Sequence, residues 1–221
     1  MDDAQKSADL GRIKPQEIPM FPLGTVLIPG AVLPLHIFEP RYREMAQFCI
    51  DNASNFGVVL IERGQEVGGG DIRSMVGTVA GIIDHQHLPD GRWLLHVVGR
   101  NKIEIAEWLK DSPYPRALVT EIPEEAGNTT IQRAQGVLKR MADFTRQANE
   151  MGYRINPMDS AAVAAGLDVS ELSYRIAELL PVGPFDKQRL LAAPTVAARL
   201  DLLEEEIGSL IDILSADGNK P

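Results

Sequence analysis

The spacing of the apolar residues changes once along the chain, near Glu124, and this change restricts the fold strongly. From about residue 18 to residue 123, short apolar runs are separated by glycine, proline and aspartate, which is typical of β-structure. After Gly127 the apolar residues recur at helical spacing almost to the end. The sequence therefore predicts an α+β fold, with a β-rich part over 18–123, a helical part over 128–214, and disordered tails over 1–17 and 215–221.

The β-rich part contains six apolar runs with the length and punctuation of strands. They cover residues 25–28, 34–37, 56–62, 73–84, 92–108 and 114–122. Gly77, Gly81 and Gly99 lie inside the long runs, where glycine often marks a bulge or a bend. We therefore expect a small, curled sheet or a partial barrel.

One helix is expected inside the β-rich part, beginning at Pro40. Proline suits the first position of a helix, and apolar residues then follow at helical spacing. These residues are Tyr42, Met45, Ala46, Cys49 and Ile50. Cys49 is the only cysteine of the chain, and its apolar neighbours predict a small buried side chain rather than a reactive thiol.

The helical part should begin with a helix from about residue 131, followed by shorter helices at 160–165 and 170–180. Pro181 and Pro184 are expected to break the series, and a long terminal helix follows Pro194. That helix carries an apolar heptad seam made of Val196, Leu200, Leu203, Ile207, Leu210 and Leu214. We expect the seam to pack against the chain's own helices; the alternative is an oligomer, formed through the C-terminal helix with another chain.

The charge balance argues against several classes of partner. The formal net charge is −9, and neither part of the chain is basic, so we expect no binding to nucleic acid or to anionic membranes. Pro29, Gly30, His36 and Glu39 interrupt the most apolar stretch, so no membrane span is expected. The acidic N-terminal residues lack the apolar region of a secretory signal, and we therefore expect a cytoplasmic location.

The motifs that commonly identify an enzyme are missing from the sequence. There is no GxxxxGK[ST] phosphate loop, no GxSxG nucleophile elbow, and no HExxH or paired CxxC zinc motif. Gly68, Gly69 and Gly70 are not followed by the lysine of a phosphate loop, so they predict a flexible hairpin loop. We therefore expect no catalytic residues and no cofactor.

Three histidines, His85, His87 and His96, surround the sequence LPDGR and raise the question of a metal site. If Asp90 and Gly91 formed a two-residue turn, His85 would face His96 across the hairpin, with His87 beside them. Pro89 better fits a type I turn followed by a left-handed glycine bulge at Gly91, because proline supplies the φ angle of the second turn position. That register pairs His85 with Leu95 and His87 with Trp93, so we expect no metal site.

Several stretches of the sequence resemble one known family. The segment IPMFPLGTVLIPGAVLPLHIFEPRYREM, which begins at Ile18, strongly resembles the start of the N-terminal domain of Lon proteases in its stand-alone form. Four more stretches agree in order: FGVVLI, VGTVAGI, LPDGRWLLHVVGR and KQRLLAAPTVAARLDLL. The likeness covers about 18–211. At Lys102 and Ile103 this chain departs from the Arg-Phe that the family often carries.

The resemblance implies a β-rich, PUA-like pseudo-barrel followed by a helical bundle with a long C-terminal helix. In Lon this domain helps to recognise substrates and to organise the hexamer, and in cereblon a related domain is a docking platform for a partner. The sequence has no Walker motif and no serine–lysine protease segment, so we expect a non-enzymatic module that binds peptides or unfolded proteins. An adaptor or regulator of a proteolytic system fits this reading. The alternative is a small-ligand-binding protein or enzyme that uses a pocket of the barrel.

The apolar segment near the start of the β-rich part is the candidate peptide-binding site. Pro29, Gly30 and Pro34 cannot complete a sheet ladder, so they should leave this segment at a sheet margin that an extended peptide can pair with. The residues expected to contact the peptide are Val26, Val32, Leu33, Leu35 and Phe38. The alternative places Leu35, Ile37 and Phe38 in the core and leaves only residues 30–33 exposed.

Overall fold

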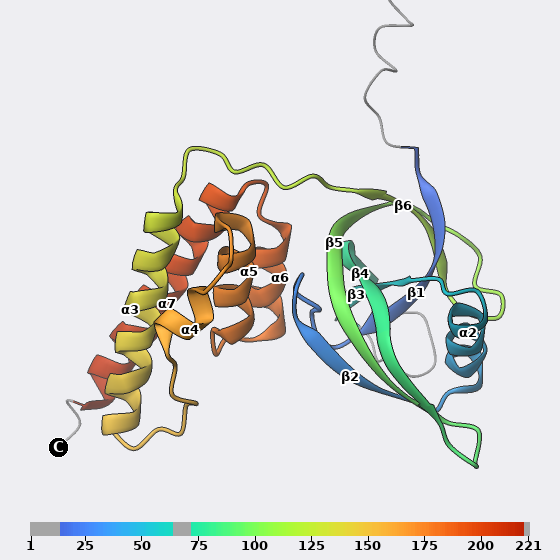
Figure 1. The fold of residues 1–221 in the computed structure, drawn as a ribbon, viewed down its shortest axis with the longest axis horizontal. Helices are drawn as coiled ribbons and strands as arrows, with labels where there is room; N and C mark the ends of the chain where they lie inside the picture. The colour runs from blue at the N-terminus through green and yellow to red at the C-terminus, as the bar shows by residue number, and fades with distance from the viewer. Residues whose placement is uncertain (1–13, 64–71, 219–221) are drawn as a thin grey trace, which may run out of the picture.

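The computed structural model describes residues 14–63 and 72–218 and shows a β-barrel beside a helical bundle (Figure 1). A long connection, residues 122–130, runs from the last strand to the first helix of the bundle. Strand structure begins at Gln16, so it includes the last two residues of the predicted tail 1–17, and the terminal helix continues to Gly218. Residues 1–13, 219–221 and the predicted loop at Gly68–Gly70 lie outside the described residues.

Five strands close the barrel and a sixth strand extends it on one side. The strands are β1 (Gln16–Leu23), β2 (Val32–Ile37), β3 (Phe56–Arg63), β4 (Ile72–His87), β5 (Trp93–Trp108) and β6 (Arg116–Glu121). Their order is β2-β5-β4-β3-β1-β6, and β6 also pairs with β5, which closes the barrel. The long β5 pairs with β2 near its start and with β6 near its end, so β2 lies outside the closed ring. Among the described strands, β1 and β3 are the one pair that runs in parallel.

Two expectations for the β-rich part are wrong. The strand β1 was missed because Pro19 and Pro22 interrupt its apolar pattern, although its side chains from Ile18 onward are buried. The residues 25–28, which were expected to form a strand, instead form an irregular loop. Leu27 and Ile28 gave this segment the apolar pattern of a strand. Their side chains fill the barrel core, but their backbone does not pair in the sheet.

Three other local expectations are confirmed: the start of a helix at Pro40, the burial of Cys49 and the register of the β4–β5 hairpin. The helix α2 (Pro40–Asp51) begins at the proline and buries Tyr42, Met45, Ala46 and Cys49. Burial raises the pKa of the Cys49 thiol to about 11, as befits an unreactive core side chain. The β4–β5 hairpin pairs His85 with Leu95 and His87 with Trp93, and Gly91 has φ +84°. In the described part of the chain, no three histidine, cysteine or acidic side chains gather as metal ligands would.

The bundle consists of α3 (Ile131–Glu150), α4 (Ser160–Ala164), α5 (Val169–Leu179), α6 (Pro184–Ala192) and α7 (Val196–Gly218). The helix α6 was not predicted, because Pro184 was taken as a break although it occupies the first turn of a helix. The seam residues Val196, Leu200, Leu203, Ile207 and Leu214 are buried within the bundle. The chain's own helices thus cover these five residues, as expected from the sequence. No described helix is long and apolar enough to cross a membrane.

The barrel and the bundle are held together by a packed interface. Tyr174 of α5 and Leu191 of α6 belong to the same apolar cluster as the barrel core. The Gln188 amide of α6 donates to the Ser74 hydroxyl of β4 at 2.8 Å. These contacts fix the position of α5 relative to β5, and that position determines the shape of the cleft between them.

Candidate functional site: a cleft between barrel and bundle

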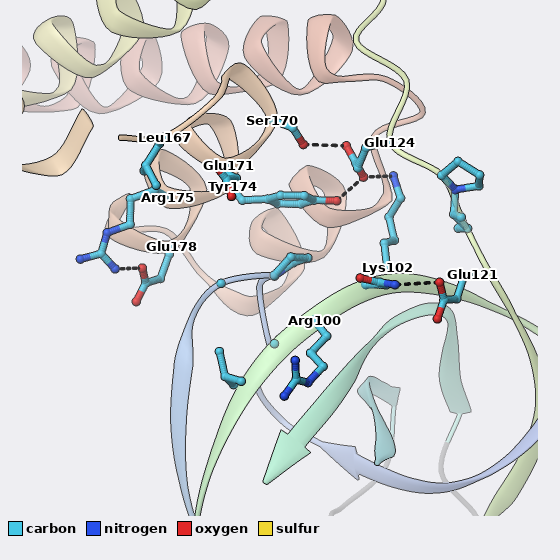
Figure 2. A pocket seen from close by; sticks show the side chains of 17 residues that line it. Arg100, Lys102, Glu121, Glu124, Leu167, Ser170, Glu171, Tyr174, Arg175 and Glu178 are labelled. Atoms are coloured by element: carbon cyan, nitrogen blue, oxygen red, sulfur yellow. Dashed lines mark hydrogen bonds and ion pairs between the residues drawn. The ribbon is translucent and has the colours of Figure 1, made fainter. Parts of the chain in front are cut away.

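A cleft of about 730 Å³ lies between β5 and α5 (Figure 2). One wall comes from the loop before β2 and from β5, and the other comes from the connection after β6 and from α5. Its apolar lining consists of Pro29, Val98, Ile122, Pro123, Leu167 and the ring of Tyr174. The cleft therefore offers mostly apolar walls at the junction of the two parts, which is a common place for a binding site.

A buried network of charged groups forms the inner end of the cleft. The Lys102 ammonium of β5 is 3.1 Å from the Glu124 carboxylate, and it also donates to the Ala193 carbonyl at 2.9 Å. The Arg199 guanidinium of α7 donates to the same carboxylate at 2.8 Å and lies 3.5 Å from the centre of the Tyr174 ring. The Tyr174 hydroxyl also donates to Glu124 (Figure 2). Glu124 thus joins the barrel, the connection and two helices of the bundle.

The protonation states of this network suit a structural role. Burial acts to raise the pKa of Glu124, but the hydrogen bond from Tyr174 and the charge of Arg199 outweigh it, and the pKa lies below its ordinary value. Burial raises the pKa of the Tyr174 hydroxyl, so this group stays protonated and acts as a donor. Neither group is suited to act as a base or a nucleophile near neutral pH. We conclude that the network positions the two walls of the cleft.

The lowered pKa of Glu124 predicts a contribution to stability that depends on pH. A carboxyl group with a depressed folded-state pKa stabilises the fold above its unfolded-state pKa, and this contribution is lost as the pH falls through the folded-state value. We expect Glu124→Gln to lower the free energy of unfolding by about 2 kcal/mol at neutral pH. The difference from the parent should shrink below pH 4.5, the ordinary value of the group. Urea denaturation at pH 7 and pH 3 measures the free energy of unfolding of the parent and of the variant. A difference between them that does not change with pH would contradict the assignment. The control is Glu107→Gln, because Glu107 is an exposed residue of β5.

Most other polar groups of the cleft already have partners. Arg175 pairs with Glu178 on α5, and the Asn101 amide donates to Glu121 at 2.7 Å (Figure 2). Glu171 accepts from the backbone N–H of Asp168 in a capping box at the start of α5. The Ser170 hydroxyl lies 3.5 Å from the Glu124 carboxylate, whose lowered pKa makes it a weak base (Figure 2). The polar side chains of the cleft are therefore held mainly by one another.

The structure divides the peptide-binding residues predicted from the sequence. Val32 is 53% exposed and Phe38 is 54% exposed, whereas Leu35 is buried in the barrel core. Val26 and Leu33 are partly buried and pack against that core. Leu35 is not exposed on the sheet surface, because side chains alternate along β2 and this one points inward. The alternative, which placed Phe38 in the core, is wrong for this residue. Phe38 directly follows the end of β2, and its side chain is exposed.

Only Val32 among the predicted residues lies beside the cleft. It pairs with Val98 of β5, which lines the cleft, and Pro29 and Gly30 of the cleft wall directly precede β2. Leu94 of β5, which was not among the predicted residues, is also apolar and exposed, and it lies on the same sheet face as Val32. The alternation between the buried Trp93 and Leu95 would have indicated its outward direction.

Comparison with known proteins places these features in a family. A family model described as the ATP-dependent protease La (LON) substrate-binding domain matches residues 17–208. Lon protease 2 of Herpetosiphon aurantiacus is 30% identical over 225 residues, which cover 98% of this chain and 26% of that protein. A LON peptidase N-terminal domain and RING finger protein of Schizosaccharomyces pombe is 24% identical over 91% of this chain and 47% of its own length. The chain thus spans a quarter to a half of these relatives.

Two solved structures have the same fold. The Lon N-terminal domain protein from Xanthomonas campestris superimposes with a TM-score of 0.64 at 24% identity, covering 86% of this chain and 98% of that one. The N-terminal domain of the Mycobacterium avium complex Lon protease gives a TM-score of 0.62 at 19% identity, covering 87% of this chain and 98% of that one. The predicted fold class, a barrel followed by a helical bundle, is confirmed.

Proposed function

The chain belongs to the family of ATP-dependent protease La (Lon) substrate-binding domains, and from this membership we propose that it recognises segments of peptides or unfolded proteins. In this role it acts as an adaptor or regulator that brings such segments to a proteolytic system. The matched family is a binding domain, so we propose that the chain itself hydrolyses neither ATP nor peptide bonds. Neither nucleic acid nor a membrane is part of the proposed role, in keeping with the net charge of −9.

The observation that supports this proposal best is the apolar-walled cleft that continues onto the exposed sheet surface at Val32. Val98 lines the cleft and pairs with Val32, so apolar surface extends from the cleft onto β2. Exposed apolar surface of this kind gains free energy when a partner covers it, at about 25 cal/mol for each Å² removed from water. Side chains of an unfolded polypeptide meet this requirement without a fixed sequence.

A small-ligand site is the second candidate function, and the size of the cleft favours it. Its volume of about 730 Å³ lies within the range of roughly 300–1,000 Å³ that is usual for pockets of small molecules. Against this candidate, polar groups of the cleft are already engaged in pairs with one another. Native mass spectrometry of the purified protein separates the two, because a bound metabolite would appear as a discrete added mass.

The proposed function predicts that charge at Val32 weakens the binding of unfolded polypeptide. A carboxylate introduced by Val32→Asp would lose its hydration when an apolar segment covers it, so we expect the dissociation constant to rise at least about tenfold. The probe is a reduced, carboxymethylated and fluorescently labelled model protein, and its anisotropy reports binding. Val32 is exposed, so circular dichroism and the melting temperature should match those of the parent.

The matched control is Ile213→Asp. Ile213 is an apolar residue of α7 that is 61% exposed, and the C-terminal end of α7 lies on the side of the bundle away from the barrel (Figure 1). This variant should bind the labelled polypeptide as the parent does. Equal affinity of Val32→Asp and Ile213→Asp, with both folded, would remove the support for the proposed site.

A further inference from the structure

The strand β2 has one edge that no described strand pairs with. It forms a ladder with β5 alone, and it is the first strand in the sheet order. The Gly99 N–H donates to the Ala31 carbonyl at 2.9 Å. Because hydrogen-bonded positions alternate in an antiparallel pair, the backbone groups of every second residue counted from Ala31 bond to β5. The backbone groups of the intervening residues, Val32, Pro34 and His36, therefore point away from β5. We call these groups the outer edge of β2.

The position of Pro34 agrees with this alternation. Proline has no N–H to give to a ladder, and in sheets it is confined to edge positions where the missing donor faces away from the neighbouring strand. The outer edge thus offers the carbonyl groups of Val32, Pro34 and His36 but the N–H groups of Val32 and His36 only. The side chains of these three residues are also exposed, so they do not bury the edge.

The outer edge is poorly suited to a second copy of this chain. Two antiparallel copies paired in the central register would place Pro34 opposite Pro34 and would lack both central hydrogen bonds. A register centred on Val32 would bring Pro34 opposite Gly30, whose N–H already donates to the Gly99 carbonyl at 2.8 Å. A foreign strand without proline at the facing positions loses one bond only, at Pro34. In these two registers, the outer edge therefore loses more hydrogen bonds with a second copy of the chain than with a foreign strand.

We infer that the outer edge of β2 takes up an extended segment of a client polypeptide as an added strand, and that Pro34 prevents the same edge from pairing with another copy of the chain. The inference rests on the proposed function, because it names how the client is held beside the cleft. Main-chain hydrogen bonds bind varied sequences, and the apolar side chains of Val32 and of the cleft select the apolar ones. Clients must present N–H groups at alternate residues, so segments with proline at those residues are excluded.

Backbone methylation of a client peptide tests strand addition directly. The probe is a labelled peptide of alternating valine and threonine with lysine at each end, in which the N–H groups of one residue type face β2. Methylating the valine nitrogens and methylating the threonine nitrogens give two matched peptides. We expect one of them to lose at least about tenfold in affinity and the other to bind within about twofold of the parent peptide. Equal binding of both methylated forms would overturn strand addition.

This result separates the inference from the proposed function. If Val32→Asp weakens binding while both methylated peptides bind like the parent peptide, the chain binds polypeptide but not as an added strand. If the parent protein does not bind the unfolded model protein at all, the proposed function itself fails.

The role of Pro34 is tested by the oligomeric state. We expect Pro34→Val to restore the missing donor and to produce a dimer whose fraction rises with concentration in sedimentation equilibrium. His36→Val is the control, because it adds the same apolar side chain to the outer edge and leaves Pro34 in place. A Pro34→Val variant that stays monomeric, or a parent that already dimerises through β2, would overturn the protective role.

Discussion

Replacing Arg199 with methionine is expected to lower the free energy of unfolding by about 3–5 kcal/mol. The Arg199 side chain is completely buried, and it donates to the Ser173 hydroxyl at 2.8 Å and to the Leu190 carbonyl at 3.2 Å. Methionine has a similar length but no donor, so these acceptors would lose their partner inside the protein. Glu124 would also lose one of its two buried cations.

The control is Arg189→Met. The Arg189 side chain is 50% exposed and pairs with Glu206 at 2.9 Å on the bundle surface, where ion pairs contribute about 0–1 kcal/mol. Urea denaturation followed by circular dichroism measures both variants. If Arg199→Met were no more destabilising than Arg189→Met, the network would not hold the barrel and the bundle together.

A cleft widened by Arg199→Met should also bind unfolded polypeptide less tightly, even where the variant remains folded.

The division of the chain into a barrel and a bundle could be predicted because it depends on local patterns. The spacing of apolar residues changes near Glu124, because residues that face a sheet core and residues that face a helix seam recur at different intervals. The register of the β4–β5 hairpin was predictable for a similar reason. Pro89 and Gly91 specify one turn geometry, and the turn determines which residues pair along the hairpin.

The cleft could not be predicted, because its parts come together only in the folded chain. Glu124 and Arg199 are 75 residues apart in the sequence, and nothing local marks them as partners among the many charged residues. Only the fold shows that Lys102 is buried and bonded to Ala193 of the bundle.

The exposed candidate residues were predictable in part. The prolines around β2 correctly indicated a sheet margin, and Val32 lies on it. The assignment of individual side chains was less successful, because the candidate residues were taken as one surface. Side chains alternate between the two faces of a strand, and Leu35 of β2 points into the core.

Alanine at Gly77 is expected to destabilise the protein by about 3 kcal/mol, because the barrel leaves no room for a side chain there. Gly77 of β4 pairs with Val59 of β3, and a Cβ atom at this position would lie 2.4 Å from the Val58 carbonyl oxygen. That oxygen belongs to the backbone of a buried strand and cannot move aside without disturbing the β3–β4 pairing. Closure of a small barrel thus depends on a residue without a side chain where the two strands approach.

The same substitution at Gly136 should stabilise the protein instead. Gly136 lies inside α3, and a Cβ atom there would meet nothing within 4 Å. Alanine has the higher helix propensity, so Gly136→Ala should raise the free energy of unfolding by about 0.5–1 kcal/mol. Denaturant titrations of both variants test the pair. If Gly77→Ala were as stable as the parent, β3 and β4 would be further apart than described, and the closed barrel that positions β5 beside the cleft would need revision.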